Sequence, residues 1–355
     1  VPLMPDQTVA RPLYQGLAAA RRWTHEPPRP RADFSLAVGA RLGELTIIGH
    51  LARGRVTELY QVWSNEHWCA LTGKIVAHEA MGADGEPPAS FRREVEVLKK
   101  LAHPNIVRFY GNGKAGGRAF LLLEYLSGPS LFDVLESLPR RRLHVPDAIR
   151  AIMHVGAAIH YLHRQGYLYR DLKPGNVLLR EGIPILVDFD VVRKINHRRP
   201  ADRLGTAPYM APEQVLREQL TTATDVYGLG ALLYELITGH WPTERPSDDD
   251  EWNDWDDDEE PVTRAGKAHA RSTGEPDLRI QYPQLCSPPV PPSEHHPRLD
   301  PELERILLRS LHPDPSQRFQ TVSGLLAALA PLLKGRHRLW PKGAPIERRA
   351  DTLTR

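Results

Sequence analysis

The sequence has little of several features that would point to particular classes of protein. Only two cysteines occur among 355 residues, Cys69 and Cys286, and so distant a pair makes neither a disulfide framework nor a metal cluster. A reducing cytoplasm is the simplest environment for such a chain. No apolar run reaches the roughly 20 residues that span a bilayer, and the first residues lack the basic start and apolar core of a signal peptide. We therefore expect neither a membrane span nor secretion.

The chain also lacks an excess of one sign of charge, because 46 Lys and Arg residues nearly balance 44 Asp and Glu residues and leave a net charge of +2. Such a balance predicts no nucleic-acid partner. Locally the charge is uneven, since residues 248–260 include ten acidic side chains and residues 336–355 are basic. Acidic runs of this kind are usually solvated loops. The alternative is that this run docks a basic partner, either another protein or the chain's own basic tail.

Local sequence patterns divide the chain into an N-terminal arm, a mainly β part and a mainly helical part. Residues 1–40 are rich in Pro, Arg and Ala without hydrophobic periodicity, which predicts a disordered arm. The next part alternates short apolar runs with turn residues and includes one helical pattern. We expect strands at 45–49, 59–63, 68–76, 106–110 and 119–125, and a helix at 90–101. Helical periodicity dominates afterwards, with helices expected at 145–164, 224–239, 301–311 and 322–333.

These patterns predict an α+β fold with two lobes. We expect one domain over residues 41–335. Its parts are a small, mainly β N-lobe with one helix (41–124), a hinge (125–129) and a larger, mainly helical C-lobe (130–335). The acidic run falls within an insertion of the C-lobe at about 244–262, and a basic tail follows at 336–355.

Residues 169–176, Tyr-Arg-Asp-Leu-Lys-Pro-Gly-Asn, place three functional groups on one tight loop. The carboxylate of Asp171 suits the orientation and deprotonation of an attacking hydroxyl, and the ammonium of Lys173 suits neutralisation of a moving phosphoryl group. The amide oxygen of Asn176 suits a magnesium ion. The apolar run 185–187 then delivers a second carboxylate for the metal, Asp188. This spacing favours phosphoryl transfer.

Three blocks in this order resemble the catalytic loop, the metal-binding motif and the end of the activation segment of eukaryotic-like (Hanks-type) serine/threonine protein kinases. They are residues 169–176, residues 185–190 (Ile-Leu-Val-Asp-Phe-Asp) and residues 205–213 (Gly-Thr-Ala-Pro-Tyr-Met-Ala-Pro-Glu). The resemblance covers roughly residues 45–333. It implies a bilobal protein kinase-like fold, ATP and Mg²⁺ as cofactors, and transfer of the γ-phosphoryl group to Ser or Thr of a protein substrate. The frequent Arg, Ala and Pro favour a bacterial source.

The glycine-rich loop of such kinases, G-x-G-x-x-G, is only partly present. The corresponding run from Ala52 to Thr57 keeps one of the three glycines, Gly54, which still permits a close approach of the backbone to phosphates. The resemblance places Leu51, Gly54 and Leu59 at the nucleotide. Because two glycines are replaced, we expect reduced nucleotide affinity rather than loss of binding.

Two registers compete for the strand lysine that contacts the phosphates. Alignment of residues 69–71 with the Val-Ala-Ile of the family puts Thr72 at that position, whereas a shift of two residues puts Lys74 there. We choose Lys74, and the period of two along a strand puts both side chains on one face. The resemblance makes Glu94 the partner that orients this lysine toward the α- and β-phosphates.

The apolar run 121–126 resembles the strand that enters a kinase hinge. The resemblance makes Leu123 the gatekeeper beside the adenine site, and backbone groups of Glu124 and Leu126 its hydrogen-bonding partners. An ordinary buried strand is the plainer interpretation, and the two are compatible. Phe189 and Tyr169 fall where kinases stack apolar side chains through both lobes.

Three supporting contacts also follow from the resemblance. Thr206 is expected to form hydrogen bonds near Asp171, and Asp225 is expected to anchor the backbone of the catalytic loop. Glu213 is expected to be buried and paired with Arg318, since a buried carboxylate without a cation is costly.

The segment between the metal motif and the third block lacks hydroxyl groups. Residues 191–204 contain no Ser, Thr or Tyr. In many kinases with an arginine before the catalytic aspartate, here Arg170, that arginine binds a phosphorylated residue of this segment. We therefore predict activity without phosphorylation within residues 191–204.

Departures from the kinase pattern favour two rival interpretations. Asp190 replaces the glycine of Asp-Phe-Gly and reaches positive φ less easily than glycine does. Together with Thr72 and the sparse glycines, it favours a pseudokinase that binds nucleotide as a scaffold or allosteric partner. The second rival is a small-molecule phosphotransferase of kinase-like fold, a kind that normally lacks a segment like residues 206–213.

Overall fold

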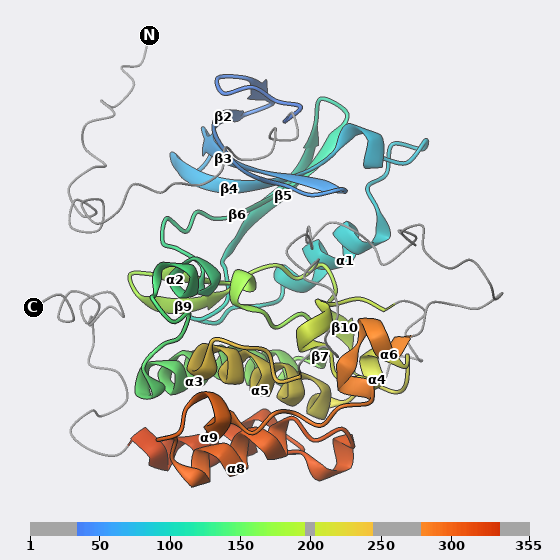
Figure 1. Cartoon of the computed structure of the whole chain (residues 1–355). Coiled ribbons are helices and arrows are strands. Elements are labelled where there is room, and N and C mark those ends of the chain that lie inside the picture. Colours follow the sequence, from blue (N-terminus) through green and yellow to red (C-terminus); the bar gives the residue numbers. More distant parts are fainter. Residues whose placement is uncertain (1–33, 196–202, 244–277, 334–355) are drawn as a thin grey trace, which may run out of the picture.

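The structure of the chain, a computed structural model, describes residues 34–195, 203–243 and 278–333. A curled sheet lies above a larger group of helices, so the molecule has two unequal lobes (Figure 1). This arrangement confirms the expected α+β, bilobal fold. The acidic run 248–260 and the basic tail 336–355 lie outside the described residues.

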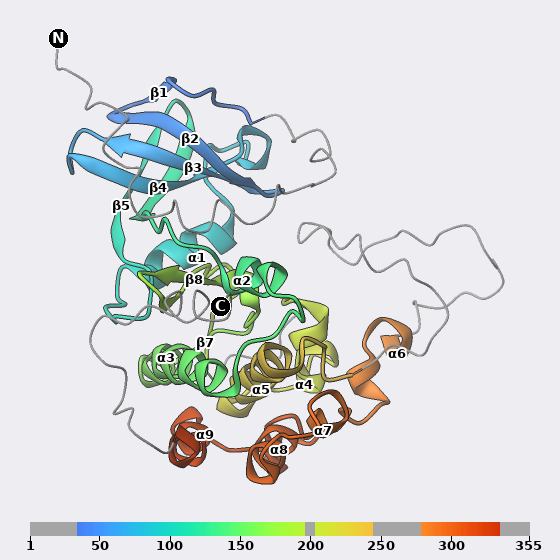
Figure 2. The same cartoon turned by 60° about the vertical axis from the view of Figure 1, so that its left-hand side comes forward.

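The N-lobe is built on a six-stranded antiparallel sheet in the order β1-β2-β3-β4-β6-β5. The strands are β1 (Arg41–Leu42), β2 (Leu45–Arg53), β3 (Thr57–Ser64), β4 (Cys69–Val76), β5 (Phe109–Ala115) and β6 (Arg118–Glu124). Along β3, partly exposed residues alternate with buried ones, as expected where successive side chains point to opposite faces. The helix α1 (Ala89–Leu98) lies beneath this sheet (Figure 2).

The C-lobe is mainly helical. Its helices are α2 (Leu131–Ser137), α3 (Val145–Arg164), α4 (Pro212–Val215), α5 (Thr222–Thr238), α6 (Leu278–Gln281), α7 (Pro292–His295), α8 (Pro301–Ser310) and α9 (Val322–Leu329). Two short antiparallel pairs carry the loops of interest, β7 (Tyr167–Leu168) with β10 (Arg193–Lys194), and β8 (Val177–Arg180) with β9 (Ile183–Leu186). Single 3-10 turns lie at His78–Ala80, Pro174–Asn176, Ala207–Tyr209, Pro283–Leu285, Pro315–Gln317 and Ala330–Leu333.

Several expected elements have other bounds in the structure. The strand expected at 106–110 begins instead at Phe109 and continues to Ala115. Its second half was not predicted because Gly111 and Gly113 are residues that strands rarely contain. The helix expected at 224–239 begins at Thr222, where the Thr221 hydroxyl accepts a hydrogen bond from the Ala223 amide and so caps the first turn. By contrast, α3 has the bounds expected from its apolar stripe.

Among the described residues, buried hydrophobic side chains form two large cores and a small cluster of Met210, Val215 and Tyr282. The main core extends from the inner face of α1 through α3, α5, α8 and α9. A smaller core lies on the outer face of the N-lobe sheet, and residues 34, 36 and 40 pack against it. These residues were expected to belong to a disordered arm, but their contacts attach them to the sheet. Among the described residues, no helix combines the length and apolarity that a bilayer crossing demands.

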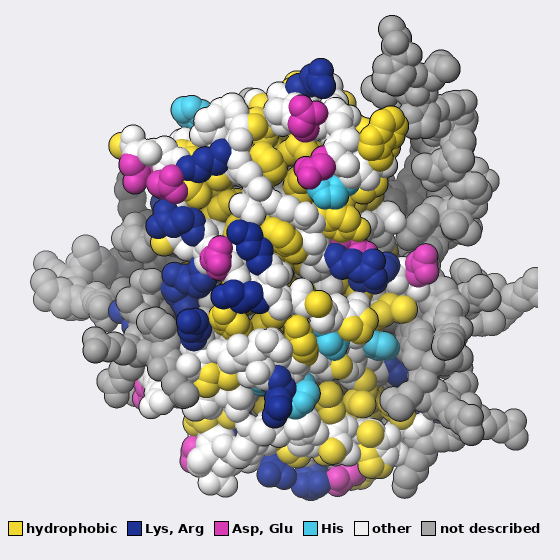
Figure 3. Space-filling view, turned by 180° about the vertical axis from the view of Figure 1, so that it is seen from behind, with side chains coloured by type: hydrophobic (Ala, Val, Ile, Leu, Met, Phe, Trp, Pro, Cys, Tyr) yellow, Lys and Arg dark blue, Asp and Glu magenta, His cyan; other side chains and the backbone are white. Residues whose placement is uncertain are grey.

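The charged side chains are unevenly spread in spite of the small net charge. Seen from behind, Lys and Arg side chains gather on one side of the molecule at the level where the two lobes meet (Figure 3). The functional residues expected from the sequence also lie at the junction of the lobes, on loops that follow β7 and β9 and on elements of the N-lobe.

Candidate active site

The catalytic loop holds Asp171 by both of its carboxylate oxygens. Oδ1 accepts hydrogen bonds from the amide and the hydroxyl of Thr206 at 2.9 and 2.8 Å, and Oδ2 accepts one from Nδ2 of Asn176 at 2.8 Å. The expected contact of Thr206 is therefore present. Because the amide nitrogen of Asn176 faces Asp171, its amide oxygen is left for another ligand.

Lys173 lies beside this carboxylate. Its Nζ is 3.9 Å from Oδ2 of Asp171, and the two side chains are only 15% and 13% exposed. A cation and an anion at this separation interact more strongly in a partly buried site than in water. The loop thus presents a base and a positive charge side by side.

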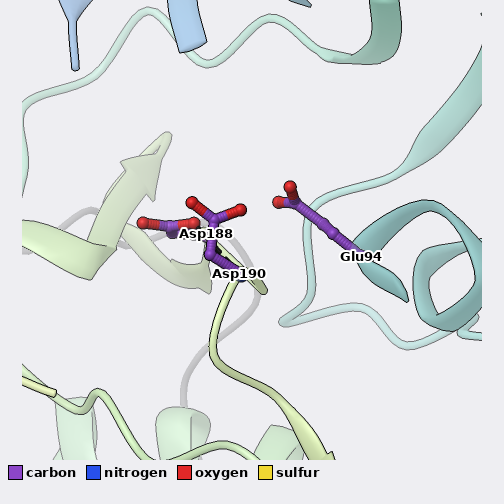
Figure 4. Close-up of side chains that lie close together, drawn as sticks. All are labelled: Glu94, Asp188 and Asp190. Atoms are coloured by element: carbon purple, nitrogen blue, oxygen red, sulfur yellow. Dashed lines mark hydrogen bonds between the residues drawn. The ribbon is translucent and has the colours of Figure 1, made fainter. Parts of the chain in front are cut away.

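A second group of side chains surrounds Lys74 in β4. Its Nζ lies 2.9 Å from Glu94 Oε2, 3.1 Å from Asp188 Oδ1 and 2.6 Å from Asp190 Oδ1. Glu94 points from α1 toward the two aspartates, which follow β9 (Figure 4). The expected pair of Lys74 with Glu94 is present.

Thr72 has a different environment. Its hydroxyl donates to the carbonyl oxygen of Glu124 at 3.3 Å, at the end of β6 where the adenine partners are expected. Geometry favours the choice of Lys74, because Lys74 rather than Thr72 reaches the carboxylates of α1 and of the segment after β9.

The charges around Lys74 strongly perturb one another. Burial alone would lower the pKa of Lys74, but Asp188, Asp190 and Glu94 raise it well above its usual value. Burial and the charge of Asp190 raise the pKa of Asp188. Burial also opposes ionisation of Asp190, yet Lys74 holds its pKa at about 2. Three carboxyl groups thus share one ammonium group.

This donor set fits a divalent cation. Glu94, Asp188 and Asp190 each offer an oxygen, and these oxygens lie within 4.8 Å of one another. Carboxylate and amide oxygens are the ligands that magnesium prefers, and a cation would offset the excess negative charge. Asp188 sits at φ 57°, a left-handed conformation that is costly for a residue with a side chain. The strain falls on this residue rather than on Asp190.

A buried residue of α5 supports the catalytic loop. Asp225, which is 1% exposed, accepts hydrogen bonds from the amides of Tyr169 and Arg170 at 2.9 and 2.8 Å. Nε2 of His163 lies 2.7 Å from the same side chain. These bonds hold Arg170 at φ 78°. The anchoring role expected of Asp225 is present.

Aromatic side chains stack between the catalytic loop and the segment that carries Asp188. The rings of Tyr169 and Phe189 meet edge to face with centroids 5.5 Å apart, a favourable aromatic geometry. The Tyr169 hydroxyl donates to the carbonyl oxygen of Val187 at 2.5 Å, and the amide of Phe189 donates to Glu94 at 3.3 Å. The same core includes Leu98 of α1, and the bond from the Phe189 amide ties the residue after Asp188 to Glu94.

The residues expected at the nucleotide line the sheet above this centre. Gly54 follows β2, where its amide donates to the Thr57 carbonyl at 2.8 Å. Leu59 is paired with Lys74 across β3 and β4, and Leu51 is exposed in β2. At the end of β6, the carbonyl of Glu124 is reached by Thr72. The side chains of Leu123, just before Glu124, and of Leu126, just after the strand, are buried.

Arg170 has unsatisfied donors. It is 4% exposed, and its Nη1 donates to the Val191 carbonyl at 3.2 Å, whereas Nε and Nη2 have no hydrogen-bond partner among the described residues. Burial and the nearby charge of Arg193 lower the pKa of Arg170 to about 10. Such donors are suited to an anion.

Two further polar contacts stabilise the end of the activation segment. The expected pair of Glu213 with Arg318 is present, with oxygen–nitrogen distances of 2.7 and 2.9 Å and almost no exposure. A second pair was not predicted, in which the Tyr209 hydroxyl donates to Oε2 of Glu235 at 2.5 Å. Burial raises the pKa of Glu235 to about 7. The sequence signal that could have revealed this pair is Glu235 itself, a charged residue within the otherwise apolar run 226–237 of α5.

Comparison with known proteins agrees with this geometry. Residues 45–327 match the protein kinase domain family. The chain belongs to this family. It is 29% identical over 259 residues to the serine/threonine-protein kinase PknB of Mycolicibacterium smegmatis, over 69% of this chain and 36% of that protein. It is 29% identical over 278 residues to PknB of Mycobacterium tuberculosis, over 74% of this chain and 39% of that protein.

Another relative and a solved structure extend the comparison. A probable serine/threonine-protein kinase of Streptomyces coelicolor is 29% identical over 303 residues, which are 80% of this chain and 39% of that protein. The chain thus spans under two-fifths of the length of these relatives. The crystal structure of the PknI kinase domain of M. tuberculosis is 22% identical, with a TM-score of 0.59 over 84% of this chain and 99% of that chain. It supports the fold.

Proposed function

We propose that this chain is a serine/threonine protein kinase that transfers the γ-phosphoryl group of ATP to a hydroxyl of a protein substrate. One observation carries the proposal. The hydroxyl-activating Asp171 accepts a hydrogen bond from Asn176 and lies 3.9 Å from the ammonium of Lys173. The phosphate-directed Lys74 is paired with Glu94 and Asp188. The amide of Val187 donates to the backbone carbonyl of Asn176 at 3.0 Å, so the segment that carries Asp188 is bonded to the end of the loop that carries Asp171. The names of the relatives support the same class of reaction.

The residues of the chain have distinct tasks in this reaction. Asp171, held by Thr206 and Asn176, orients the attacking hydroxyl and accepts its proton. Lys173 offsets the negative charge that develops on the transferred group, and Lys74, oriented by Glu94, binds the α- and β-phosphates. Fixed charges of this kind act without reorganisation during the reaction.

Magnesium would be held by Asn176 and Asp188. When bound, it supplies positive charge that neutralises the phosphate oxygens. The adenine ring is assigned to the backbone of Glu124 and Leu126, with Leu51, Gly54 and Leu59 covering the nucleotide from the sheet. We place the reaction in the cytoplasm, since both cysteines are free among the described residues and ATP is available there.

The specificity for Ser and Thr rests on the segment at residues 205–213. Thr206 contacts the catalytic carboxylate directly, and the buried pair of Glu213 with Arg318 fixes the other end of the segment. The protein substrate is basic if the acidic run 248–260 takes part in its recognition. Solvation of that run is the simpler expectation for so dense a charge.

A pseudokinase is the second candidate. The contact of 2.6 Å between Asp190 and Lys74 favours it, because that carboxylate occupies the ammonium that phosphates would bind. A pseudokinase of this kind would bind nucleotide and act as a scaffold or allosteric partner without transferring phosphate.

Transfer of radiolabel from γ-labelled ATP in the presence of magnesium decides between the two candidates. A kinase labels itself or a generic basic protein, and Asp171→Asn abolishes the label by removing the base while the nucleotide still binds. Nucleotide binding without label in the unmodified chain assigns the scaffold function instead. If a phosphorylated product forms, acid hydrolysis and phosphoamino-acid analysis are expected to yield phosphoserine or phosphothreonine, and phosphotyrosine alone would contradict the proposal.

A further inference from the structure

A buried carboxylate lies on the outer face of the N-lobe sheet, opposite the main core. Glu58 in β3 has no exposed surface. It accepts hydrogen bonds from the Tyr60 hydroxyl at 2.8 Å and from Nη2 of Arg118 at 2.6 Å, and Nε of Arg53 lies 3.3 Å from its other oxygen. Burial alone would raise the pKa of Glu58, but its hydrogen bonds lower it to about 2. The group is therefore a permanent anion that depends on its partners.

The remaining partners come from a short segment ahead of the sheet, residues 34–36. The amide of Ser35 donates to one oxygen of Glu58 at 3.1 Å, and its hydroxyl donates to the other at 2.5 Å. Nη1 of Arg118 donates to the same hydroxyl at 2.5 Å. Ser35 thus completes the coordination of the buried carboxylate.

Neighbouring residues bind this segment to the same face. The ring of Phe34 stacks on His50 with centroids 4.3 Å apart and planes 4° apart. The amide of Leu36 donates to the Tyr60 hydroxyl at 3.1 Å, and its carbonyl lies 2.8 Å from Nε2 of His50. Polar and aromatic contacts together hold the segment in one register on the sheet.

The network reaches both strands that carry the nucleotide residues. Arg53 ends β2 and directly precedes Gly54 in the phosphate-binding loop. Nε of Arg118 donates to the carbonyl of Val76 at 2.7 Å, two residues beyond Lys74 in β4. Glu58 is therefore linked to the base of the loop through Arg53 and to the end of the lysine strand through Arg118.

The segment does not belong to the part of the chain that matches the family. The match begins at residue 45, whereas residues 34–36 precede β1. The segment therefore lies ahead of the matched part, whereas Glu58 and Arg118 lie within it.

We propose that residues 34–36 form a latch that sets the position of the phosphate-binding loop, with Ser35, Glu58 and Arg118 as positioning residues. The proposal deepens the proposed function, because it rests on ATP binding at that loop. With the latch in place, Glu58 is fully paired and Arg53 is held at the base of the loop. When the segment leaves, the buried carboxylate loses two hydrogen bonds, and the loop gains conformational freedom that nucleotide binding must remove.

Ser35→Ala in the full chain tests the latch. We expect the KM for ATP to rise about fivefold to tenfold, as for loss of one charge-assisted hydrogen bond, while kcat changes by less than about twofold. Ser35→Thr keeps the hydroxyl and should restore the KM. Ser64→Ala is the matched control, since this buried hydroxyl lies at the other end of β3 and binds His67. It should leave the KM unchanged.

A double-mutant cycle separates positioning from general stability. If Ser35 acts through Glu58, then Ser35→Ala adds almost nothing to the KM of a Glu58→Gln chain. Amide hydrogen exchange of residues 53–57 should be faster in Ser35→Ala than in the unmodified chain, with and without nucleotide. Additive KM effects, or unchanged KM and exchange in Ser35→Ala, would overturn the latch.

The outcome is distinguishable from failure of the proposed function. If the unmodified chain transfers no phosphate, the exchange of residues 53–57 still reports whether the segment holds the loop. A chain that begins at residue 37 should show the same KM and exchange as Ser35→Ala or a larger change. If that shortened chain does not fold, the single substitution decides.

Discussion

Asp190 lies closer to Lys74 than the expected partner Glu94 or Asp188 does, at 2.6 Å compared with 2.9 and 3.1 Å. This carboxylate competes with phosphates for the ammonium group. We expect Asp190→Gly to lower the KM for ATP about fivefold, the effect of removing one competing ion pair of about 1 kcal/mol. Initial rates at varied ATP concentration measure it.

Asp190→Asn distinguishes charge from backbone freedom in that experiment. It removes the charge and keeps the size of the side chain, so it should act like Asp190→Gly if competition for Lys74 is the cause. A rise in KM with either substitution would show instead that the carboxylate contributes to metal binding.

Lys74 rather than Thr72 is expected to be essential for turnover. Lys74→Met removes the ammonium that Glu94 orients, and we expect kcat/KM to fall by at least about 100-fold, as for other fixed charges in active sites. Thr72→Val is the matched control from the same face of β4, with an expected loss below about threefold. A larger loss in Thr72→Val than in Lys74→Met would reverse the assignment of the two residues.

Activity is expected without phosphorylation of residues 191–204, which contain no hydroxyl side chain. Treatment with a broad-specificity phosphatase, followed by its removal, should leave the initial rate unchanged. Mass spectrometry supplies the control by locating any phosphosites. Lost turnover together with a site mapped to this segment contradicts the prediction.

The stability of the C-lobe should depend on the ionisation of Glu235. The pKa of Glu235 is about 7 in the folded chain, compared with its ordinary value of 4.5 in the unfolded chain. The folded state therefore binds the proton more tightly. Stability is therefore full below pH 4.5 and falls as the pH rises toward 7, by up to about 3 kcal/mol. Glu235→Gln should remove this loss and be relatively more stable at pH 8 than at pH 5.

Urea unfolding at both pH values checks this sign. The quantity to compare is the difference in unfolding free energy between Glu235→Gln and the unmodified chain, because other groups titrate in both. A difference that does not grow from pH 5 to pH 8 would mean that Glu235 has an ordinary pKa.

The pair of Glu213 with Arg318 should show the cost of an uncompensated buried charge. We expect Arg318→Met to destabilise the chain by about 3–5 kcal/mol, because Glu213 is left buried without its partner. Thermal unfolding measures the loss. The double substitution Glu213→Gln with Arg318→Met should recover part of it, and equal destabilisation by the single and double variants would argue against the charge as the cause.

Local signals were sufficient for the catalytic loop and for α3. Asp171, Lys173 and Asn176 lie within six residues of one another, so their spacing alone brings them together. The stripe of α3 fixes its bounds for a similar reason, since the period of a buried helix is a property of adjacent turns. The contacts of Asp225, Glu213 and Thr206 were found only because the resemblance indicated them.

The other contacts of the site could not be predicted, because they join residues that are far apart in the sequence. Thr72 and Lys74 share a strand face, so sequence could not choose between them until α1 placed Glu94 beside one of them. Asp190 meets Lys74 across 116 positions of the chain, and no local pattern records such a distance. Glu58 resembles a solvated strand residue, although residues 23 and 60 positions away bury it.

The attachment of the catalytic loop to Asp225 has a consequence for its dynamics. That carboxylate belongs to α5, a helix enclosed on nearly all sides, and it receives the amides of Tyr169 and Arg170. These two amides are thus protected from solvent as well as the backbone amides in the core of the C-lobe. Their exchange with deuterated solvent should require complete unfolding rather than local fluctuation, whereas we expect the loop at Gly54 to exchange through local openings. The site accordingly combines a rigid catalytic loop in the C-lobe with a phosphate-binding loop in the N-lobe that can adjust its position.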